Sequence, residues 1–162
     1  MQGAVTGDGI ITLVAALLAA AVVMIGYSFQ KTQARKAEQA IIYGEAIRAA
    51  HDYLEAPYRV LRRDGSAGAR MAITDHVSDV QSRLAYYSTL LRVHGPIDVG
   101  EAYRELVAAA RAEAGPQMTA AWRDRPTRND RDVPLGTRLE QPRSVIALEN
   151  TIRLMGKQAP PG

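Results

Sequence analysis

The sequence predicts an all-α protein in which a single N-terminal transmembrane helix continues into an antiparallel bundle of three to four helices. Three observations lead to this fold class. Residues 10–29 form an apolar run without a charged side chain. Apolar residues then recur at spacings of three and four, which is the period of amphipathic helices. Finally, no strand pattern that could build a sheet is visible in the chain.

The first predicted element is the transmembrane helix at residues 10–29. A helix of this length rises about 30 Å, which matches the hydrocarbon thickness of a bilayer. No Lys or Arg precedes the run, whereas a cleaved signal peptide begins with a basic region. The residues predicted to anchor the helix in lipid are Ile10, Leu13, Leu17, Val22, Ile25 and Phe29.

The charges on either side of the span predict its orientation. Residues 1–9 form a short head without Lys or Arg, whereas Lys31, Arg35 and Lys36 follow the span directly. Because positively charged flanks stay in the cytoplasm, we expect an extracytoplasmic N-terminus and a cytoplasmic C-terminal domain at a bacterial inner membrane. The three cations are expected to contact lipid headgroups, so the bilayer is the first predicted partner.

Residues 30–123 are expected to form the cytoplasmic helical bundle. Two adjacent apolar rows, one starting at Ile42 and the other at Tyr43, predict a first helix that runs from the membrane to about Arg63. Residues 64–68 have the composition of a turn and should connect this helix to the next one.

Two further helices complete the predicted bundle. One is predicted over about 69–93, and the other over about 99–114 with Asp98 as its N-cap. Gly115 and Pro116 are expected to stop the latter, because proline lacks the amide that the helix needs. Only a short helical turn is expected after them.

The C-terminal part is predicted to be less regular. Residues 124–143 are rich in proline and charge, which indicates a long flexible loop exposed to solvent. Residues 144–156 should form a last helix, and 157–162 a disordered tail. The predicted inner face of the last helix consists of Val145, Leu148, Ile152 and Met155.

The sequence contains no motif for a catalytic, cofactor-binding or metal-binding site. It has no cysteine, no Gly-x-Ser-x-Gly elbow and no phosphate-binding loop ending in Gly-Lys-Ser/Thr. Its three histidines lack ligand spacing, and the Glu-x-x-His of a di-iron bundle is missing. We therefore expect a protein that is not an enzyme and needs no cofactor. A metal-dependent enzyme remains an alternative, with His51, Glu55, His76 and Asp79 as its candidate ligands.

Arginines near the end of the first soluble helix and in the loop form the predicted contact site for a protein partner. The set comprises Tyr58, Arg59, Arg62, Arg63, Arg125 and Arg128. A net charge of only +3 and a single tryptophan argue against nucleic acid as the partner. Small residues along one face of the span would let two copies pack closely, so a homo-oligomer stays open.

These features favour a membrane-anchored, non-enzymatic interaction or scaffold protein that faces the cytoplasm. The alternative is a phage-type membrane effector, such as a lysis or superinfection-exclusion factor. The abundance of Arg and Ala motivates it, because this composition is typical of GC-rich bacteria and their phages. The two hypotheses differ in the part of the protein that carries the function. In the first it is an exposed surface patch, and in the second it is the membrane segment.

Overall fold

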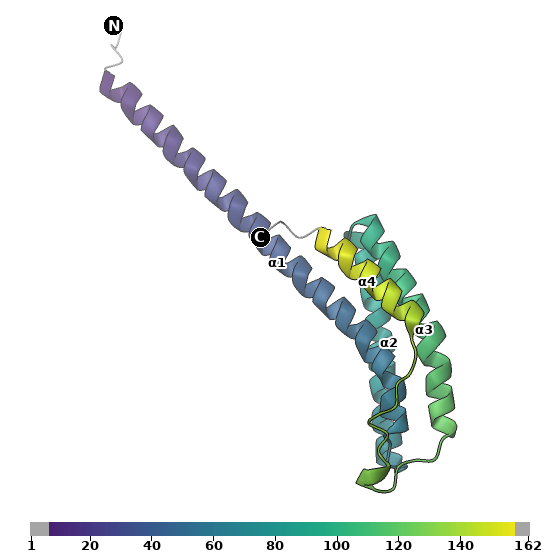
Figure 1. Cartoon of the computed structure of the whole chain (residues 1–162). Helices are drawn as coiled ribbons and strands as arrows, with labels where there is room; N and C mark the ends of the chain where they lie inside the picture. The colour runs from purple at the N-terminus through teal and green to yellow at the C-terminus, as the bar shows by residue number, and fades with distance from the viewer. Residues whose placement is uncertain (1–6, 158–162) are drawn as a thin grey trace. The chain divides into compact units, whose positions relative to one another are not determined.

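Figure 1 shows the chain as a computed structural model that describes residues 7–157. Side chains are described for residues 23, 24, 27, 30, 31 and 33–157, with the exception of 130. The chain divides into two compact units, which comprise residues 1–41 and 42–162.

The first unit contains the first part of α1 (Gly7–Leu61). In the part of the chain that the structure describes, no helix is long and apolar enough to cross a membrane. The side chains of all six predicted anchor residues lie outside the described residues, so the transmembrane helix stays a prediction. These residues are Ile10, Leu13, Leu17, Val22, Ile25 and Phe29. Most of the predicted head (1–9) and tail (157–162) also lies outside.

The second unit is a bundle formed by the end of α1, α2 (Ala67–His94), α3 (Ile97–Arg123) and α4 (Pro142–Lys157). Consecutive helices run antiparallel (Figure 1). Within residues 7–157 all regular structure is helical, including a short 3₁₀ helix, η1 (Asp130–Asp132). The prediction of an all-α helical bundle is thereby confirmed.

The turn between α1 and α2 is built by three residues. Gly65 has a φ of +82°, a left-handed conformation that glycine adopts without strain. The Asp64 carboxylate accepts a hydrogen bond from the Ser66 amide at 2.8 Å, and Ser66 Oγ accepts one from the Ala69 amide at 3.0 Å. Ser66 therefore caps α2, and the chain can fold back along α1.

Alanines fill much of the bundle core. The Tyr103 hydroxyl donates a hydrogen bond to the Ala46 carbonyl oxygen at 3.0 Å and joins α3 to α1. Burial of this hydroxyl raises the pKa of Tyr103. Because alanine side chains are short, the helix backbones can approach each other closely. The alanines without accessible surface are Ala46, Ala49, Ala50, Ala56, Ala110 and Ala114.

The third helix is longer than predicted. It continues through Gly115 and Pro116 to Arg123, so the expected stop at the proline is wrong. A proline removes one backbone hydrogen bond, but a glycine before it has no Cβ to clash with the proline ring. Met118 and Ala121, beyond the proline, are buried in the core. Their burial offsets the lost hydrogen bond.

The predicted N-cap of the third helix is also wrong. The helix begins at Ile97 directly after Pro96, and no side chain caps it. Asp98 lies inside the first turn, where its carboxylate accepts a hydrogen bond from the Val99 amide at 2.9 Å. Pro96 already holds a φ of −58°, close to the helical value, and the helix starts two residues earlier than predicted. The negative charge of Asp98 still interacts favourably with the positive end of the helix dipole.

α4 buries a different face from the one predicted. Val145 and Ile152 belong to the predicted inner face, yet they are 51% and 50% exposed. Ser144 and Thr151 are fully buried instead. The Thr151 hydroxyl bonds to the Ala102 carbonyl oxygen of α3 at 3.2 Å, which removes the cost of burying a polar group. The other two residues of the predicted face do pack against the core.

Candidate functional site

The predicted contact site at the end of α1 is largely used inside the fold. Arg63, which was expected on the surface, has only 8% of its surface accessible. The prediction of Arg63 as a partner contact is therefore wrong. Its guanidinium donates hydrogen bonds to the carbonyl oxygens of Val60 (2.8 Å), Ala121 (2.8 Å), Trp122 (3.1 Å) and Asp124.

Helix ends explain why this cation is buried. The last turns of α1 and α3 leave carbonyl groups without donors and carry the negative end of the helix dipole. The planar guanidinium of Arg63 donates to both ends at once and lies 5.0 Å from the centre of the Trp122 ring. Periodicity could not reveal this, because α1 ends at Leu61 and the helical period no longer directs the Arg63 side chain.

Two other residues of the predicted contact site also contact their own chain. The Tyr58 hydroxyl accepts a hydrogen bond from the Leu139 amide at 2.8 Å. The Arg62 guanidinium lies 5.5 Å from the Tyr58 ring centre and 3.2 Å from a Glu55 carboxylate oxygen. Arg59 is exposed. Of the predicted residues on α1, Arg59 is thus the one best placed to meet another molecule.

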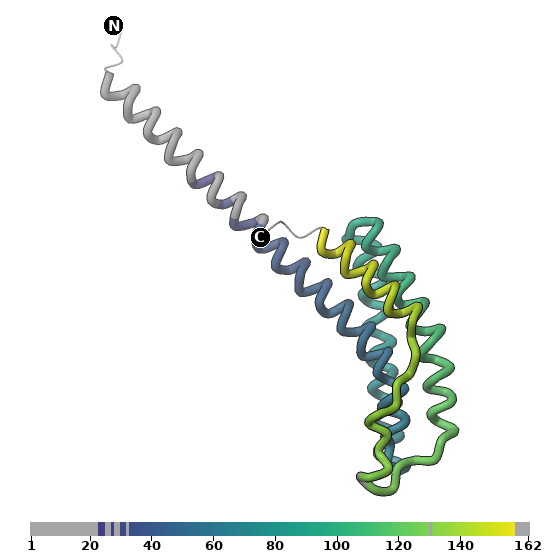
Figure 2. Tube along the Cα trace, in the orientation of Figure 1, coloured from purple at the N-terminus to yellow at the C-terminus, as the bar shows by residue number. Residues whose placement is uncertain are grey.

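The connector, residues 124–141, is held against α1 by hydrogen bonds. Its path from the end of α3 along α1 to α4 can be followed in Figure 2. The Thr127 amide and hydroxyl both donate to the Arg63 carbonyl oxygen at 2.9 Å. The Gln141 side-chain amide donates to the Leu54 carbonyl oxygen at 3.1 Å. These hydrogen bonds anchor the connector at defined positions, which its composition did not predict.

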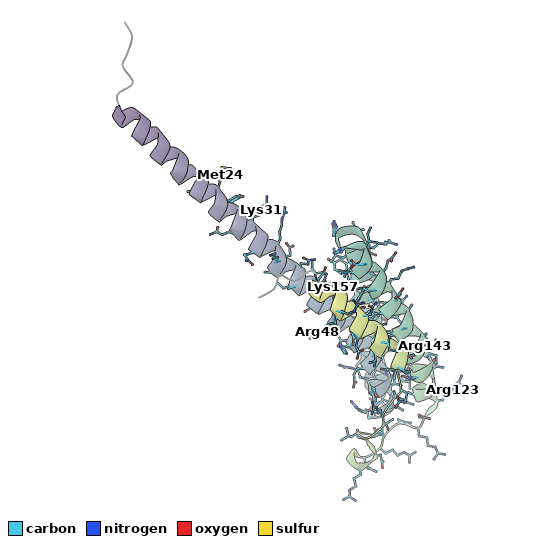
Figure 3. The ribbon with its side chains drawn as sticks, turned by 45° about the horizontal axis from the view of Figure 1, so that its top comes forward. Met24, Lys31, Arg48, Arg123, Arg143 and Lys157 are labelled. Carbon is cyan, nitrogen blue, oxygen red and sulfur yellow. The ribbon has the colours of Figure 1, made fainter. Side chains whose placement is uncertain are left out.

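Glu113 of α3 acts as an N-cap for α4. Its carboxylate accepts hydrogen bonds from the amides of Arg143 and Ser144, each at 2.9 Å, and from the Ser144 hydroxyl at 2.6 Å. Burial alone would raise the pKa of Glu113, but these hydrogen bonds and the charge of Arg143 lower it below its ordinary value. Arg143 marks this end of α4 in Figure 3.

A polar cluster joins α1 to α2. The Arg83 guanidinium donates to Asp52 of α1 at 2.8 Å and to Asp79 of α2 at 3.0 Å. His76 has a buried Nε2 atom without a hydrogen-bond partner among the described residues. Burial and the charge of Arg59 lower the pKa of His76, against the opposing effect of the nearby carboxylates.

The metal hypothesis gains no geometric support from this cluster. All four of its candidate ligands belong to the described residues. No three His, Asp or Glu side chains in that part of the chain converge closely enough to hold a metal ion. The sequence-based ligands were His51, Glu55, His76 and Asp79.

A hollow of about 400 Å³ lies between the end of α2 and the beginning of α3. Its walls carry Arg92 from α2 and Arg104 from α3. Neither side chain makes an ion pair or a hydrogen bond within the described part of the chain. Ile97 at its edge is 82% exposed. We call this hollow the α2–α3 groove, and it is lined by Ser88, Thr89, Arg92, Ile97, Gly100, Glu101 and Arg104.

Sequence reasoning assigned no role to the α2–α3 groove. Only the packing of two helices brings its two walls together, and no local motif marks that event. A signal was nevertheless present on α3, where Ile97, Glu101 and Arg104 recur at spacings of four and three. Such a row defines one face of a helix, and its mixture of apolar and charged residues could have indicated a contact surface.

The remaining predicted contact residues lie on the surface. Arg125 and Arg128 are exposed in the connector. Lys31 (Figure 3) and Arg35 are exposed on α1, and Lys36 is half-exposed. Their roles toward a partner or toward lipid stay predictions.

Comparison with protein-family models, with curated proteins and with solved structures finds no match to this chain. The function is therefore inferred from the residues of the chain itself.

Proposed function

We propose that this protein is a membrane-anchored, non-enzymatic helical interaction module whose bundle faces the cytoplasm and binds a protein partner. The observation that carries this proposal is the α2–α3 groove, an accessible hollow with an arginine on each helix that has no ion-pair partner among the residues the structure describes. Unpaired charges in a concave surface are available to another molecule.

The anchor is supported by the sequence at the N-terminal end. Residues 10–29 carry no charge over a length that matches a bilayer, and three cations follow directly. Lys31, Arg35 and Lys36 would keep this end of the span in the cytoplasm and contact lipid headgroups. The protein would thus be a single-pass protein of a bacterial inner membrane, with its N-terminus outside.

The charged side chains that join the helices support a binding role over a catalytic one. Arg63 closes two helix ends, Glu113 caps α4, and Arg83 joins α1 to α2. Each group is committed to holding helices together, so none of them is free to move a proton to or from a substrate.

The test expresses the full chain in bacteria. We expect it to stay with the membrane fraction after alkaline extraction of these cells, and a cross-linker applied to the cells to capture a protein partner on its cytoplasmic side. Light scattering of the chain purified into nanodiscs would show whether a second copy of this chain is bound instead of a foreign partner. Recovery of the full chain entirely in the aqueous fraction would refute the anchor. Capture of neither a partner nor a second copy would refute the interaction role.

A further inference from the structure

We propose that the α2–α3 groove binds an acidic peptide segment that presents an aliphatic side chain between its carboxylates. This inference rests on the proposed function, because it names the chemistry of the partner that the bundle would bind.

The shape of the groove fits a short segment of polypeptide. Its volume of about 400 Å³ lies within the range of about 300–1,000 Å³ that is typical of ligand sites. Gly100, which also lines the groove, has no side chain, and a Cβ at this position would lie 3.2 Å from the Leu91 carbonyl oxygen. The backbones of α2 and α3 are therefore close together at this position.

The charges of the groove select a carboxylate. Arg92 and Arg104 stand on opposite walls, and a guanidinium binds a carboxylate through two parallel hydrogen bonds. The Ser88 hydroxyl already donates to the Leu84 carbonyl oxygen at 2.7 Å, so it offers an acceptor to a peptide amide. Glu101 also lines the groove and would repel a misplaced carboxylate, which would fix the register of the segment.

The apolar edge selects a peptide over other anions. Ile97 is 82% exposed and would contact an aliphatic side chain of the segment. Two cations fall short of the four to eight that mark a binding site for anionic lipid. The residues that line the groove include no aromatic ring on which a nucleic-acid base could stack.

The test measures binding of a defined probe to the full chain in nanodiscs of neutral lipid. The probe is a short fluorescein-labelled peptide with the core Glu-Glu-Leu-Glu, and its control carries Gln in place of every Glu. We expect the acidic probe to raise fluorescence anisotropy in a saturable way, at least tenfold more tightly than the Gln control. Moderate salt should weaken this binding.

Variants locate the site on the bundle. The double variant Arg92→Glu and Arg104→Glu should weaken binding of the acidic probe at least tenfold, and Ile97→Ser severalfold. The matched control is Arg125→Glu with Arg128→Glu, which makes the same change of charge in the connector and should leave binding unchanged. Circular dichroism of each variant reports whether the bundle still folds.

Three results would overturn the inference. The first is that neither peptide binds in a saturable way. The second is that the groove variant and the connector variant lose the same amount of affinity for the acidic probe. The third is that the chain binds vesicles containing anionic lipid but binds no peptide. The proposed function is judged separately by the cross-linking experiment. If a partner is captured equally by the wild type and by the groove variant, the function stands and this inference fails.

Discussion

Replacing Arg63 by methionine removes the guanidinium that joins the ends of α1 and α3, while it keeps a side chain of similar length. The buried carbonyl oxygen of Ala121 loses its donor in this variant, whereas the Val60 carbonyl oxygen keeps the hydrogen bond from the Arg63 backbone amide at 3.3 Å. A buried carbonyl that loses its donor costs about 1–3 kcal/mol. The cation–π contact with Trp122 adds about 0.5–1 kcal/mol, and burial of the methionine side chain returns part of the loss. We expect R63M to lower the free energy of unfolding by about 2 kcal/mol.

The assay is urea unfolding of the full chain in detergent, followed by the fluorescence of Trp122 and by circular dichroism. Trp122 is the single tryptophan of the sequence and lies beside the substituted position, so it reports on the junction directly. Arg63→Lys should lose about half as much stability, because an ammonium cannot reach two helix ends in one plane.

The matched control is Arg62→Met, one residue away. Its guanidinium pairs with Glu55 at 3.2 Å on the surface, where both side chains are more than a third exposed. Exposed pairs contribute about 0–1 kcal/mol, so this variant should unfold close to the wild type. The reasoning is refuted if R63M and R62M unfold at the same urea concentration.

Four further substitutions test other positions of the bundle. Gly100→Ala should lower stability by about 1–2 kcal/mol in thermal unfolding, because backbone atoms of α2 block its Cβ. Gly44→Ala, which meets nothing within 4 Å, should raise stability by up to about 1 kcal/mol, and the opposite order would contradict the packing. Glu113→Gln should be less stable than the wild type at neutral pH, and the difference should shrink as the pH falls below the ordinary glutamate pKa of 4.5, since a lowered folded pKa gives stability that protonation removes. His76→Gln should reduce the loss of stability between about pH 7 and pH 5, because a histidine whose folded pKa is lowered binds its proton preferentially when unfolded; identical pH profiles would exclude this role.

Helical periodicity predicted the position of a helix correctly where that helix has a single apolar face. The second helix was predicted over about 69–93 and is observed at Ala67–His94. The prediction failed at Pro116, because a local rule about proline cannot weigh the burial of Met118 against distant parts of the chain. It failed on α4 for a related reason. The burial of Thr151 depends on a carbonyl of another helix, and no sequence window contains both groups.

The candidate site was less accessible to sequence reasoning than the fold. Arginines beside a helix end look solvated in the sequence, and Arg62 does lie on the surface. Arg63 does not, because two helix ends converge on its guanidinium only after the chain has folded. The α2–α3 groove likewise depends on the packing that brings Arg92 of α2 and Arg104 of α3 to the same hollow. Residue type indicates the chemistry that a side chain can perform, whereas tertiary packing decides whether it remains free to perform it.

The alanine-filled interior has a consequence for the variation that this protein can tolerate. Ala49 and Ala110 have no accessible surface, so a larger side chain at either position would press against the neighbouring helices. Selection should therefore remove substitutions by larger residues at these positions. Natural variants should differ mainly at the solvent-exposed faces of the helices. In a core of this kind, the short distance between helix backbones restricts the residues that can be accepted more than their hydrophobicity does.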